Sequence, residues 1–453
     1  MFQPVFLKYH KSMKFNEKEL KAATCAVVLK KYGSDEVFGI STDTRTIKEG
    51  DIYLPLKGET FDGEAFIPKA LESGAVGYFT TSDKVFDGAK VVFKVEDTLK
   101  SYLKLARFYR NKINPITVAI TGSSGKTTTK EMVYSVLSQK FKTQKTFSNH
   151  NNEIGLCQTI LSMEEDTEAL IVEMGMRGLG EIELLSEFSE PDYAIITNAG
   201  SAHIGRLGSL DNIAKAKSEI VTHLRKSLIS QDNPRLKKFV NFEGEKIWYS
   251  LADAVVLEQR QGYSKFIYKS LEYELNVEGL YNVENSLSAI ELGYKLGISY
   301  DEIKRGLLAY KPIEKRWEVE EVSGYKIIND SYNANPESMK ASVSTFVELY
   351  KAPVVILGDM GELGENSEEL HREVGKFLAE KSNGDVRFFT VGNLAKKIGQ
   401  ELQLKNYFVK NFENNEDVSR YILDNVNVGC TIFLKASRSM KFEQIIENLR
   451  EKI

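Results

Sequence analysis

Apolar runs alternate with helical stretches through the central part of the chain. The runs at 116–120, 169–174 and 193–200 are nearly continuous in apolar residues. Parallel strands that are covered on both faces have this pattern, because neither face meets water. We therefore expect an open α/β unit built on a parallel sheet.

Shorter apolar runs follow Lys226, and their close spacing predicts an antiparallel extension of this unit. They lie at 238–242, 246–250, 254–258, 265–269 and 271–277. The segments 281–297 and 300–310 then have the periodicity of helices.

A second α/β pattern begins near Lys311-Pro312. Apolar runs at 325–331, 354–359, 386–392 and 431–437 alternate with helical segments such as 338–350. This alternation predicts a second open, doubly wound sheet.

The N-terminal part mixes short strands with turns, and a helical stretch at 99–113 ends near Asn114-Pro115. At ~150 residues per domain, 453 residues suggest about three domains. The fold class that we predict is α/β with three domains, at 1–113, 114–313 and 314–453.

Composition narrows the choice of partners. The net charge is −4, so no global field attracts nucleic acid or anionic lipid. No apolar run reaches the ~18 residues of a membrane-spanning helix. We expect no nucleic-acid binding and no membrane insertion.

The cysteines are typical of a protein in a reducing compartment, and the N-terminus does not have the pattern of a signal peptide. Cys25, Cys157 and Cys430 lie far apart and form neither a zinc-binding spacing nor a disulfide framework. We interpret them as small hydrophobic residues of a cytoplasmic protein. The N-terminal stretch is basic, but no cleavage site follows, so we expect no signal peptide. Met13 is an alternative start.

The strand at 116–120 leads into a glycine-rich turn, TGSSGKTT at 121–128. Gly122 and Gly125 allow the backbone to curl closely around phosphate oxygens. Backbone N–H groups at the start of the following helix attract an anion. Lys126 can reach terminal phosphates, and the Thr127 hydroxyl can bind Mg²⁺. The alternative is an ordinary glycine-serine turn with a lysine that faces solvent.

Polar residues also follow the next two strands. Glu173 ends one strand, and Thr197-Asn198 precedes His203 after the other. Ligands of open α/β sheets bind beyond the carboxyl ends of strands, and a carboxylate there can organise Mg²⁺. Taken singly, Glu173 is also compatible with a surface position and His203 with a structural role. Lys215 and Lys217, in a probable helix, are compatible with an exposed face.

Three further segments have the density of polar side chains expected of a ligand-binding loop. SNHNNEIG at 148–155 and NDSYNANPESM at 329–339 are rich in amides, and LKASRSM at 434–440 carries cations at a strand end. Such cations can meet a carboxylate or a phosphate. The alternative for the two amide-rich segments is a simple turn.

These motifs resemble the Mur ligase family, which forms amide bonds at the expense of ATP in bacterial cell-wall synthesis. The resemblance spans nearly the whole chain. NANP-x-SM at 333–339 and GDM-x-ELG at 358–364 are similar to the branch that adds D-alanyl-D-alanine to a UDP-N-acetylmuramoyl tripeptide. STDTR at 41–45 and the segment 54–67 resemble its uridine-nucleotide-binding region.

The resemblance implies roles for the three domains. The first would bind the UDP-sugar, the second would be a P-loop, ATP-binding ligase domain, and the third, Rossmann-like, would close on the nucleotide. The implied reaction proceeds through an acyl phosphate, in the cytoplasm, in a monomer. It uses ATP and Mg²⁺ at two sites.

Site residues follow from the same resemblance. The catalytic residues would be Lys126, Lys217, Glu173 and His203, and the metal ligands Thr127, Glu173, His203 and Lys217, with Lys217 carbamylated in preference to Lys215. ATP would be bound by Gly122, Ser123, Ser124, Gly125, Lys126, Thr127, Thr128, Asn285, Arg316, Asn333 and Asn335. Substrate would be bound by Ser41, Thr44, Arg45, Lys57, Asp62, Gly63, Asn151, Asn152, Asp330, Lys435 and Arg438.

Some positions depart from the pattern expected of the family. Tyr281 stands where a histidine is common, Asn329 replaces the first of two aspartates, and Ala436 replaces a glycine. Three alternatives remain: another amide ligase of the Mur or folylpolyglutamate type, a P-loop kinase or NTPase, and a nucleotide sensor without activity. The third residue of the peptide, lysine or diaminopimelate, stays open.

Overall fold

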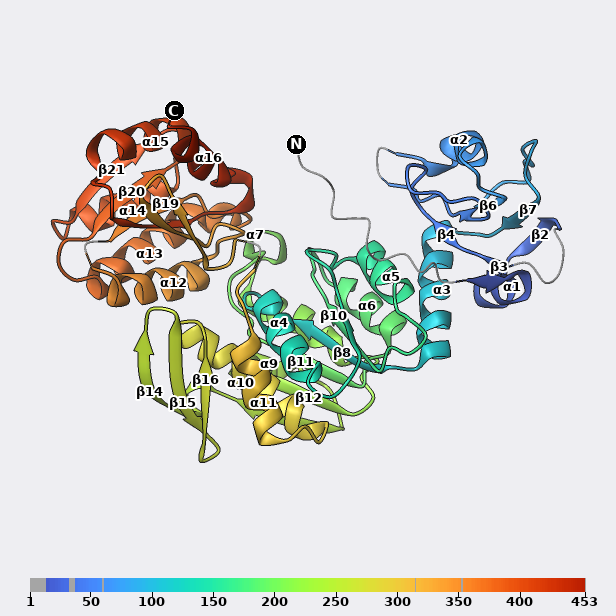
Figure 1. Cartoon of the computed structure of the whole chain (residues 1–453), viewed down its shortest axis with the longest axis horizontal. Helices are drawn as coiled ribbons and strands as arrows, with labels where there is room; N and C mark the ends of the chain where they lie inside the picture. Colours follow the sequence, from blue (N-terminus) through green and yellow to red (C-terminus); the bar gives the residue numbers. More distant parts are fainter. Residues whose placement is uncertain (1–13, 32–36, 59–60, 314, 352, 453) are drawn as a thin grey trace. The chain divides into compact units, whose positions relative to one another are not determined.

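The computed structural model describes residues 14–31, 37–58, 61–313, 315–351 and 353–452. The possible start at Met13 and the predicted domain boundary at residue 314 lie outside the described residues. The chain, drawn in Figure 1, divides into two compact units, and each is described by itself. The first comprises residues up to 118, 141–174 and 184–191, and the second comprises 119–140, 175–183 and 192–453.

A five-stranded sheet forms the N-terminal part of the first unit, in the order β2-β7-β6-β5-β4. Its strands are β2 (Val27–Lys30), β4 (Ile40–Ser41), β5 (Ile52–Tyr53), β6 (Gly77–Thr80) and β7 (Val91–Lys94). The last four run parallel, and β2 is antiparallel to β7. A short pair, β1 (Phe15–Asn16) and β3 (Val37–Phe38), lies outside this sheet.

The helices of this part are α1 (Glu17–Thr24), η2 (Gly63–Phe66), α2 (Ile67–Glu72) and α3 (Thr98–Ile113). Tyr53, Ile67, Tyr78 and Val92 pack in one buried cluster beneath α2. The predicted helix at 99–113 is confirmed as α3, which begins at the side-chain cap of Asp97.

The central sheet has six strands in the order β13-β12-β11-β8-β10-β9. They are β8 (Ile116–Thr121), β9 (Thr143–Lys145), β10 (Ala169–Glu173), β11 (Tyr193–Ile196), β12 (Ser227–Gln231) and β13 (Glu245–Tyr249). The pairs β9–β10, β11–β12 and β12–β13 are parallel. The buried runs of β8, β10 and β11 match the strands that the sequence predicts.

Helices connect and cover these strands. They are α4 (Lys126–Leu137), α5 (Glu153–Leu161), α6 (Glu181–Ser189), α7 (Ile204–Leu207), α8 (Leu210–Ser218), η3 (Glu219–Val221), α9 (Pro234–Phe239), α10 (Leu280–Lys295) and α11 (Tyr300–Ala309). Both α10 and α11 pack against α4, the helix that follows the glycine-rich turn.

The antiparallel extension is smaller than the sequence predicts. After η4 (Leu251–Asp253) it consists of β14 (Ala254–Arg260), β15 (Tyr263–Tyr268) and β16 (Leu271–Leu275). The predicted strand at 238–242 is wrong: its first residues end α9, which Asn233 caps and Pro234 begins. The run at 246–250 forms β13 and pairs in parallel with β12, so it belongs to the central sheet.

The C-terminal part of the second unit contains another six-stranded sheet, ordered β17-β18-β22-β19-β20-β21. Its strands are β17 (Glu318–Val322), β18 (Tyr325–Asn329), β19 (Val354–Gly358), β20 (Arg387–Val391), β21 (Phe408–Phe412) and β22 (Thr431–Lys435). All neighbours are parallel except β17, which is antiparallel to β18. This is the predicted doubly wound sheet with an added edge strand.

The helices of this part are α12 (Pro336–Leu349), η5 (Gly364–Asn366), α13 (Ser367–Lys381), α14 (Ala395–Gln403), α15 (Asn415–Asn425), η6 (Arg438–Met440) and α16 (Glu443–Glu451). Its core gathers Ile356, Phe389, Ile422, Leu434 and Ile445 between sheet and helices. In the part of the chain that the structure describes, no helix is long and apolar enough to span a membrane.

Candidate active site

The glycine-rich turn between β8 and α4 forms a tight loop that admits no larger side chain at two positions. Gly122 has a φ of 153°, and a Cβ there would overlap the Thr197 hydroxyl. Gly125 has a φ of 77°, and its Cβ would lie 2.5 Å from the Asn285 side-chain oxygen. The two glycines therefore let the backbone form a cradle in which phosphate oxygens fit.

The segment after β11 braces this loop through hydrogen bonds. The Thr197 hydroxyl donates to the Ser124 carbonyl over 2.5 Å, and the Asn198 amide donates to the same oxygen over 3.1 Å. In return the Ser124 backbone N–H donates to Asn198 over 3.0 Å. Ser123 donates to the Gly200 carbonyl over 2.9 Å. The loop is thus held in shape by protein contacts before any ligand binds, a condition for efficient anion binding.

Lys126 is the first residue of α4, and its ammonium group is turned back over the loop. Its Nζ donates to the Gly122 carbonyl over 2.7 Å. This places a positive charge beside the cradle, where it favours a polyphosphate. The next residue, Thr127, is buried, and its hydroxyl accepts a hydrogen bond from Arg316 over 2.8 Å.

Arg316 comes from the segment before β17 and reaches the loop from the C-terminal part of the chain. Its guanidinium stacks on the Tyr332 ring, 3.7 Å from the centroid. One of its terminal nitrogens is buried and has no hydrogen-bond partner among the described residues. A buried cationic donor without a partner is costly, so this nitrogen fits a site that receives an anionic or carbonyl oxygen.

The two lysines of α8 have opposite environments. Lys215 is exposed, whereas Lys217 is fully buried, and its Nζ has no hydrogen-bond partner within the described ranges. Burial, reinforced by the nearby charge of Lys126, holds the pKa of Lys217 well below its usual value. This shift favours the neutral amine, which is the nucleophilic form.

His203 precedes α7 and has a φ of 65°. Its Nδ1 lies 2.5 Å from a carboxylate oxygen of Glu362. Burial lowers the pKa of His203; the Glu362 charge opposes this shift, and the charges of Lys126 and Lys217 reinforce it. The interactions with both lysines indicate that these three predicted site residues belong to one electrostatic neighbourhood.

Glu173, Asn151 and Asn152 belong to the first unit. Glu173 ends β10 and is buried; it accepts a hydrogen bond from the Asn151 amide over 3.1 Å. Its backbone N–H donates to the Thr146 hydroxyl over 2.9 Å. Asn152 caps α5 by accepting from the Gly155 backbone over 3.0 Å, so its side chain has a structural role here.

The polar residues predicted in the C-terminal part separate into two groups. Lys435 and Asp330 form a buried ion pair of 2.5 Å. Arg438 is exposed and pairs instead with Glu443 over 3.0 Å.

The side-chain amides of the NANP turn form hydrogen bonds with neighbouring backbone groups. Asn335 caps α12 by accepting from the Ser338 backbone, and Asn333 accepts from the Ala334 backbone. As they stand, these two side-chain oxygens support the turn.

The residues predicted to bind the uridine nucleotide follow the carboxyl ends of β4 and β5. Ser41 is buried, Thr44 is half-buried, and the Arg45 side chain is 83% exposed and pairs with Asp43. Lys57 and Asp62 face each other over 3.5 Å. The neighbouring Gly63 has no room for a Cβ against the Leu56 backbone.

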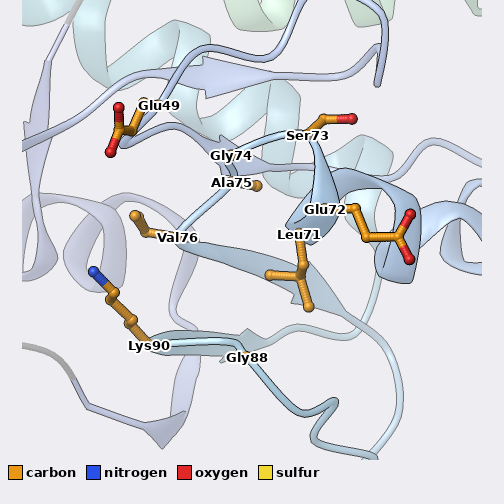
Figure 2. A pocket seen from close by; sticks show the side chains of 9 residues that line it. All are labelled: Glu49, Leu71, Glu72, Ser73, Gly74, Ala75, Val76, Gly88 and Lys90. Carbon is orange, nitrogen blue, oxygen red and sulfur yellow. The ribbon is translucent and has the colours of Figure 1, made fainter.

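A hollow of about 440 Å³ lies at the opposite, amino ends of β5, β6 and β7. Figure 2 shows its lining side chains, with Glu49 and Lys90 on one side and Glu72 directed away on the other. None of the predicted site residues lines it. Because ligands of parallel sheets bind beyond the carboxyl ends of strands, we expect the substrate at the opposite edge of this sheet.

The described residues contain no cluster of three or more His, Cys, Asp or Glu side chains arranged for a metal ion. A metal site here would need other donors, such as the Thr127 hydroxyl or a modified Lys217. Hydroxyl and carboxylate oxygens are donors that Mg²⁺ accepts together with phosphate oxygens.

Two acidic residues of the site were not identified from the sequence. Glu362 contacts His203, and Glu337 binds Ser201 through both its carboxylate oxygens. Both lie inside motifs, GDM-x-ELG and NANP-x-SM, that the sequence does single out. Only the fold reveals their contacts, because the partners are distant in the chain.

Comparison with known proteins identifies the family. Three family models match: the Mur ligase family catalytic domain at residues 36–109, the Mur ligase middle domain at 120–293, and the Mur ligase glutamate ligase domain at 315–438.

Two relatives carry the name UDP-N-acetylmuramoyl-tripeptide–D-alanyl-D-alanine ligase. The relative from Bacillus subtilis is 36% identical, with 93% of this chain and 94% of the relative covered. The relative from Synechocystis is 33% identical, with 90% and 91% covered.

Solved structures agree with this result. A MurF structure from Acinetobacter baumannii superposes with a TM-score of 0.88 at 26% identity, covering 98% of this chain and 100% of that one. The MurF ligase from Thermotoga maritima in complex with ADP has a TM-score of 0.80 at 28% identity, with 91% and 97% covered. The chain therefore belongs to the Mur ligase family and has its three-domain α/β fold.

Proposed function

We propose that this chain is an ATP-dependent amide ligase that joins D-alanyl-D-alanine to the terminal carboxylate of a UDP-N-acetylmuramoyl tripeptide. This step belongs to the synthesis of peptidoglycan precursors. The observation that carries the proposal is the braced glycine loop with Lys126 folded over it. Relatives named for this reaction, which the chain matches over nine-tenths of its length, support the choice of substrates.

The chemistry of amide formation explains why a phosphate loop is needed. A carboxylate is a poor electrophile because oxide would have to leave. Transfer of the γ-phosphoryl group of ATP to the carboxylate gives an acyl phosphate and ADP. The amine of the dipeptide then attacks the carbonyl carbon, and phosphate leaves as the amide forms. The loop and Lys126 hold the phosphates in line and offset their charge during transfer.

The contacts around the loop suggest how the nucleotide is held. Ser123, Ser124 and Thr128 would contribute with Gly122 and Gly125 to the phosphate cradle. Arg316 is already at the loop, and Asn285 lies against Gly125. For Asn333 and Asn335 the same role requires the turn before α12 to exchange its internal hydrogen bonds for nucleotide contacts. The ADP complex of the Thermotoga maritima relative supports ATP as the nucleotide.

Magnesium would be held at two sites by Thr127, His203, Glu173 and Lys217. The ion would supply positive charge that lowers the repulsion between the phosphates and the carboxylate. Thr127 and His203 contribute a hydroxyl and an imidazole, and Glu173 a buried carboxylate at the end of the strand next to β8 in the sheet order. The hydroxyl and the carboxylate are oxygen donors, the type that Mg²⁺ prefers.

Lys217 would become a metal ligand through carbamylation. The neutral form of its buried amine, which the lowered pKa favours, can add to CO₂. The addition forms an N–C bond and releases one proton, which converts a base into a carboxylate-like anion. The full burial and missing hydrogen-bond partner of its Nζ, against the exposure of Lys215, support Lys217 as the modified residue.

The remaining assignments concern domains and location. The N-terminal domain, 1–113, would bind the UDP-sugar through Ser41, Thr44, Arg45, Lys57, Asp62 and Gly63. Asn151, Asn152, Asp330, Lys435 and Arg438 would contact the peptide or the transferred group as the domain 314–453 closes on the ligase domain 114–313. We place the enzyme in the cytoplasm as a monomer.

The experiment that tests the function measures ADP, phosphate and amide product with a panel of UDP-muramoyl peptides. We expect all three products only when ATP, a UDP-N-acetylmuramoyl tripeptide and D-alanyl-D-alanine are present together. ATP consumption at the same rate with and without the dipeptide would indicate a kinase or NTPase instead. Product with glutamate or a single amino acid in place of the dipeptide would indicate another amide ligase of this fold.

A further inference from the structure

Two loops of the second unit lie against each other beside the phosphate site. One is the segment 199–205, which follows β11 and carries His203; the other is the segment 361–364, which precedes η5. The Gly205 backbone N–H donates to the Glu362 carbonyl over 3.0 Å. Gly205 and Gly364 approach so closely that a Cβ on either would meet the backbone of the other. This contact is made by backbone atoms, so it does not require the Glu362 side chain.

The Glu362 side chain adds a separate contact to this packing. One carboxylate oxygen lies 2.5 Å from Nδ1 of His203, and the other lies 3.8 Å from Arg206. The His203 contact has the distance of a hydrogen bond but not its alignment. Within the described residues, the half-exposed Glu362 carboxylate has one close histidine partner, which is His203.

A second carboxylate holds the same loop from another side. Glu337, near the start of α12, accepts hydrogen bonds from the Ser201 backbone N–H over 3.0 Å and from its hydroxyl over 2.8 Å. Gly200 leaves room for this carboxylate, since a Cβ there would lie 2.9 Å from the Glu337 carboxyl carbon. Two acidic residues of the C-terminal part thus fix the backbone and the histidine of one central loop.

This arrangement decides which imidazole nitrogen carries the proton. A neutral imidazole has one N–H and one lone pair, and a carboxylate beside one nitrogen keeps the proton there. With the proton on Nδ1 facing Glu362, the lone pair of Nε2 is free to bind a metal ion. Carboxylates that hold the second nitrogen of a metal-binding histidine orient the ring and raise its basicity.

We propose that Glu362 is a positioning residue that orients His203 and fixes its proton on Nδ1, while Glu337 holds the backbone of the same loop. The C-terminal part of the chain thereby completes a metal-binding residue of the central part. The inference rests on the proposed function, in which His203 binds Mg²⁺. The inference adds Glu362 to the proposed site as a residue that acts through His203 and does not itself contact the reactants.

The first test measures the tautomer of His203 and needs no activity. The protein is labelled with ¹⁵N-histidine, and the His203 resonances are identified by their loss in His203→Gln. We expect a protonated Nδ1 in the unmodified protein and a mixture of tautomers in Glu362→Ala. Glu362→Gln, which keeps an acceptor oxygen, should restore part of the Nδ1-protonated form. An unchanged tautomer in Glu362→Ala would overturn the inference.

The second test measures metal affinity, with Mn²⁺ as the probe in the presence of ADP and free Mn²⁺ followed by electron paramagnetic resonance. We expect Glu362→Ala to weaken binding by about 10- to 100-fold. Glu362→Gln should lie between Glu362→Ala and the unmodified protein, because it keeps the contact but loses the charge. Glu365→Ala is the matched control, since it removes an exposed carboxylate of η5, three residues after Glu362.

The outcomes separate this inference from the metal assignment itself. If His203→Gln weakens Mn²⁺ binding but Glu362→Ala does not, only the role of Glu362 is overturned. If His203→Gln leaves Mn²⁺ affinity unchanged, the metal role of His203 and the inference fail together. Equal losses in Glu362→Ala, Glu362→Gln and Glu365→Ala would show a general effect of charge and would also overturn it.

Discussion

The phosphate loop and the N-terminal segment 41–63 are both predicted to bind phosphorylated ligands, yet they are built differently. The loop has its glycines, hydroxyls and amides packed against a neighbouring strand end, with hydrogen bonds to Thr197 and Asn198. The N-terminal segment instead presents two exposed cationic side chains, Arg45 and Lys57, which pair with nearby acidic residues.

The difference shows two ways of making an anion site. In the loop, backbone groups and a helix start provide the binding geometry, so it exists without ligand. In the segment, flexible cationic side chains would have to leave their present partners when the nucleotide binds. We therefore expect substitutions in the loop to affect nucleotide binding and catalysis strongly. Substitutions in the N-terminal segment should affect one substrate and leave the fold unchanged.

The largest effect is expected for Lys126→Ala. Loss of a positive charge that stabilises the transferred phosphoryl group should lower kcat by about 10³-fold or more, of order 4 kcal/mol. Phosphate release with both substrates present measures it. Lys215→Ala, which removes an exposed lysine of α8, should keep nearly full activity. A Lys126→Ala enzyme with near-normal turnover would remove the basis of the mechanism.

Gly122→Ala should have the next largest effect. Its Cβ would overlap the Thr197 hydroxyl, so the loop would shift at a cost of about 1–3 kcal/mol. We expect ATP affinity, measured by calorimetry, to fall by roughly 5- to 150-fold. Gly180→Ala is a suitable control, because Gly180 also has a positive φ of 85° but open space around it. Equal effects of the two substitutions would refute the steric explanation.

Lys217→Met tests the buried amine through its pH dependence. The pKa of Lys217 is lowered in the folded protein, so the unfolded chain binds one more proton between the folded-state pKa and about 10.5. Across that range the free energy of unfolding contributed by Lys217 rises by about 1.4 kcal/mol per pH unit. Denaturant unfolding in CO₂-free buffer should therefore show Lys217→Met to be the more stable protein at low pH. The difference should shrink as the pH rises toward 10.5, and a constant difference would contradict the lowered pKa.

The smallest effect on the fold is expected for Arg45→Ala. The exposed pair with Asp43 contributes little, so the free energy of unfolding should stay nearly unchanged. The KM for the UDP-muramoyl peptide should rise severalfold, while the KM for ATP stays the same. The comparison requires the two sites to be independent. A raised KM for ATP in Arg45→Ala would contradict that independence.

The sequence predicts the parts of the fold that depend on local pattern. The strand, turn and helix of the phosphate loop were identified correctly, because the apolar run and the order of glycine, lysine and threonine are contiguous. β12 was missed, since Ser227 and Ser230 interrupt its apolar run although both are buried. The segment 238–242 is misassigned, because its short apolar run and its spacing from the next runs suggest a strand, while Asn233 and Pro234 favour a helix start.

Contacts between segments that are distant in the sequence cannot be predicted from local pattern. The pairing of Ser201 with Glu337 joins residues 136 positions apart, and only the packing of α12 beside the central loop creates it. The same is true of Glu362 and His203. The opposite environments of Lys215 and Lys217 depend on which face of α8 is covered, although the sequence favoured Lys217 through its resemblance to the family.

The central claim is that ATP phosphorylates the terminal carboxylate of the tripeptide. Tracing an oxygen atom from that carboxylate into the released phosphate tests this claim most directly. The terminal carboxylate of the tripeptide is labelled with ¹⁸O, and the phosphate released during ligation is examined by mass spectrometry. If the γ-phosphoryl group is transferred to that carboxylate and then displaced by the amine, each released phosphate must carry one ¹⁸O atom. Phosphate without ¹⁸O, formed while the amide product accumulates, would contradict the account.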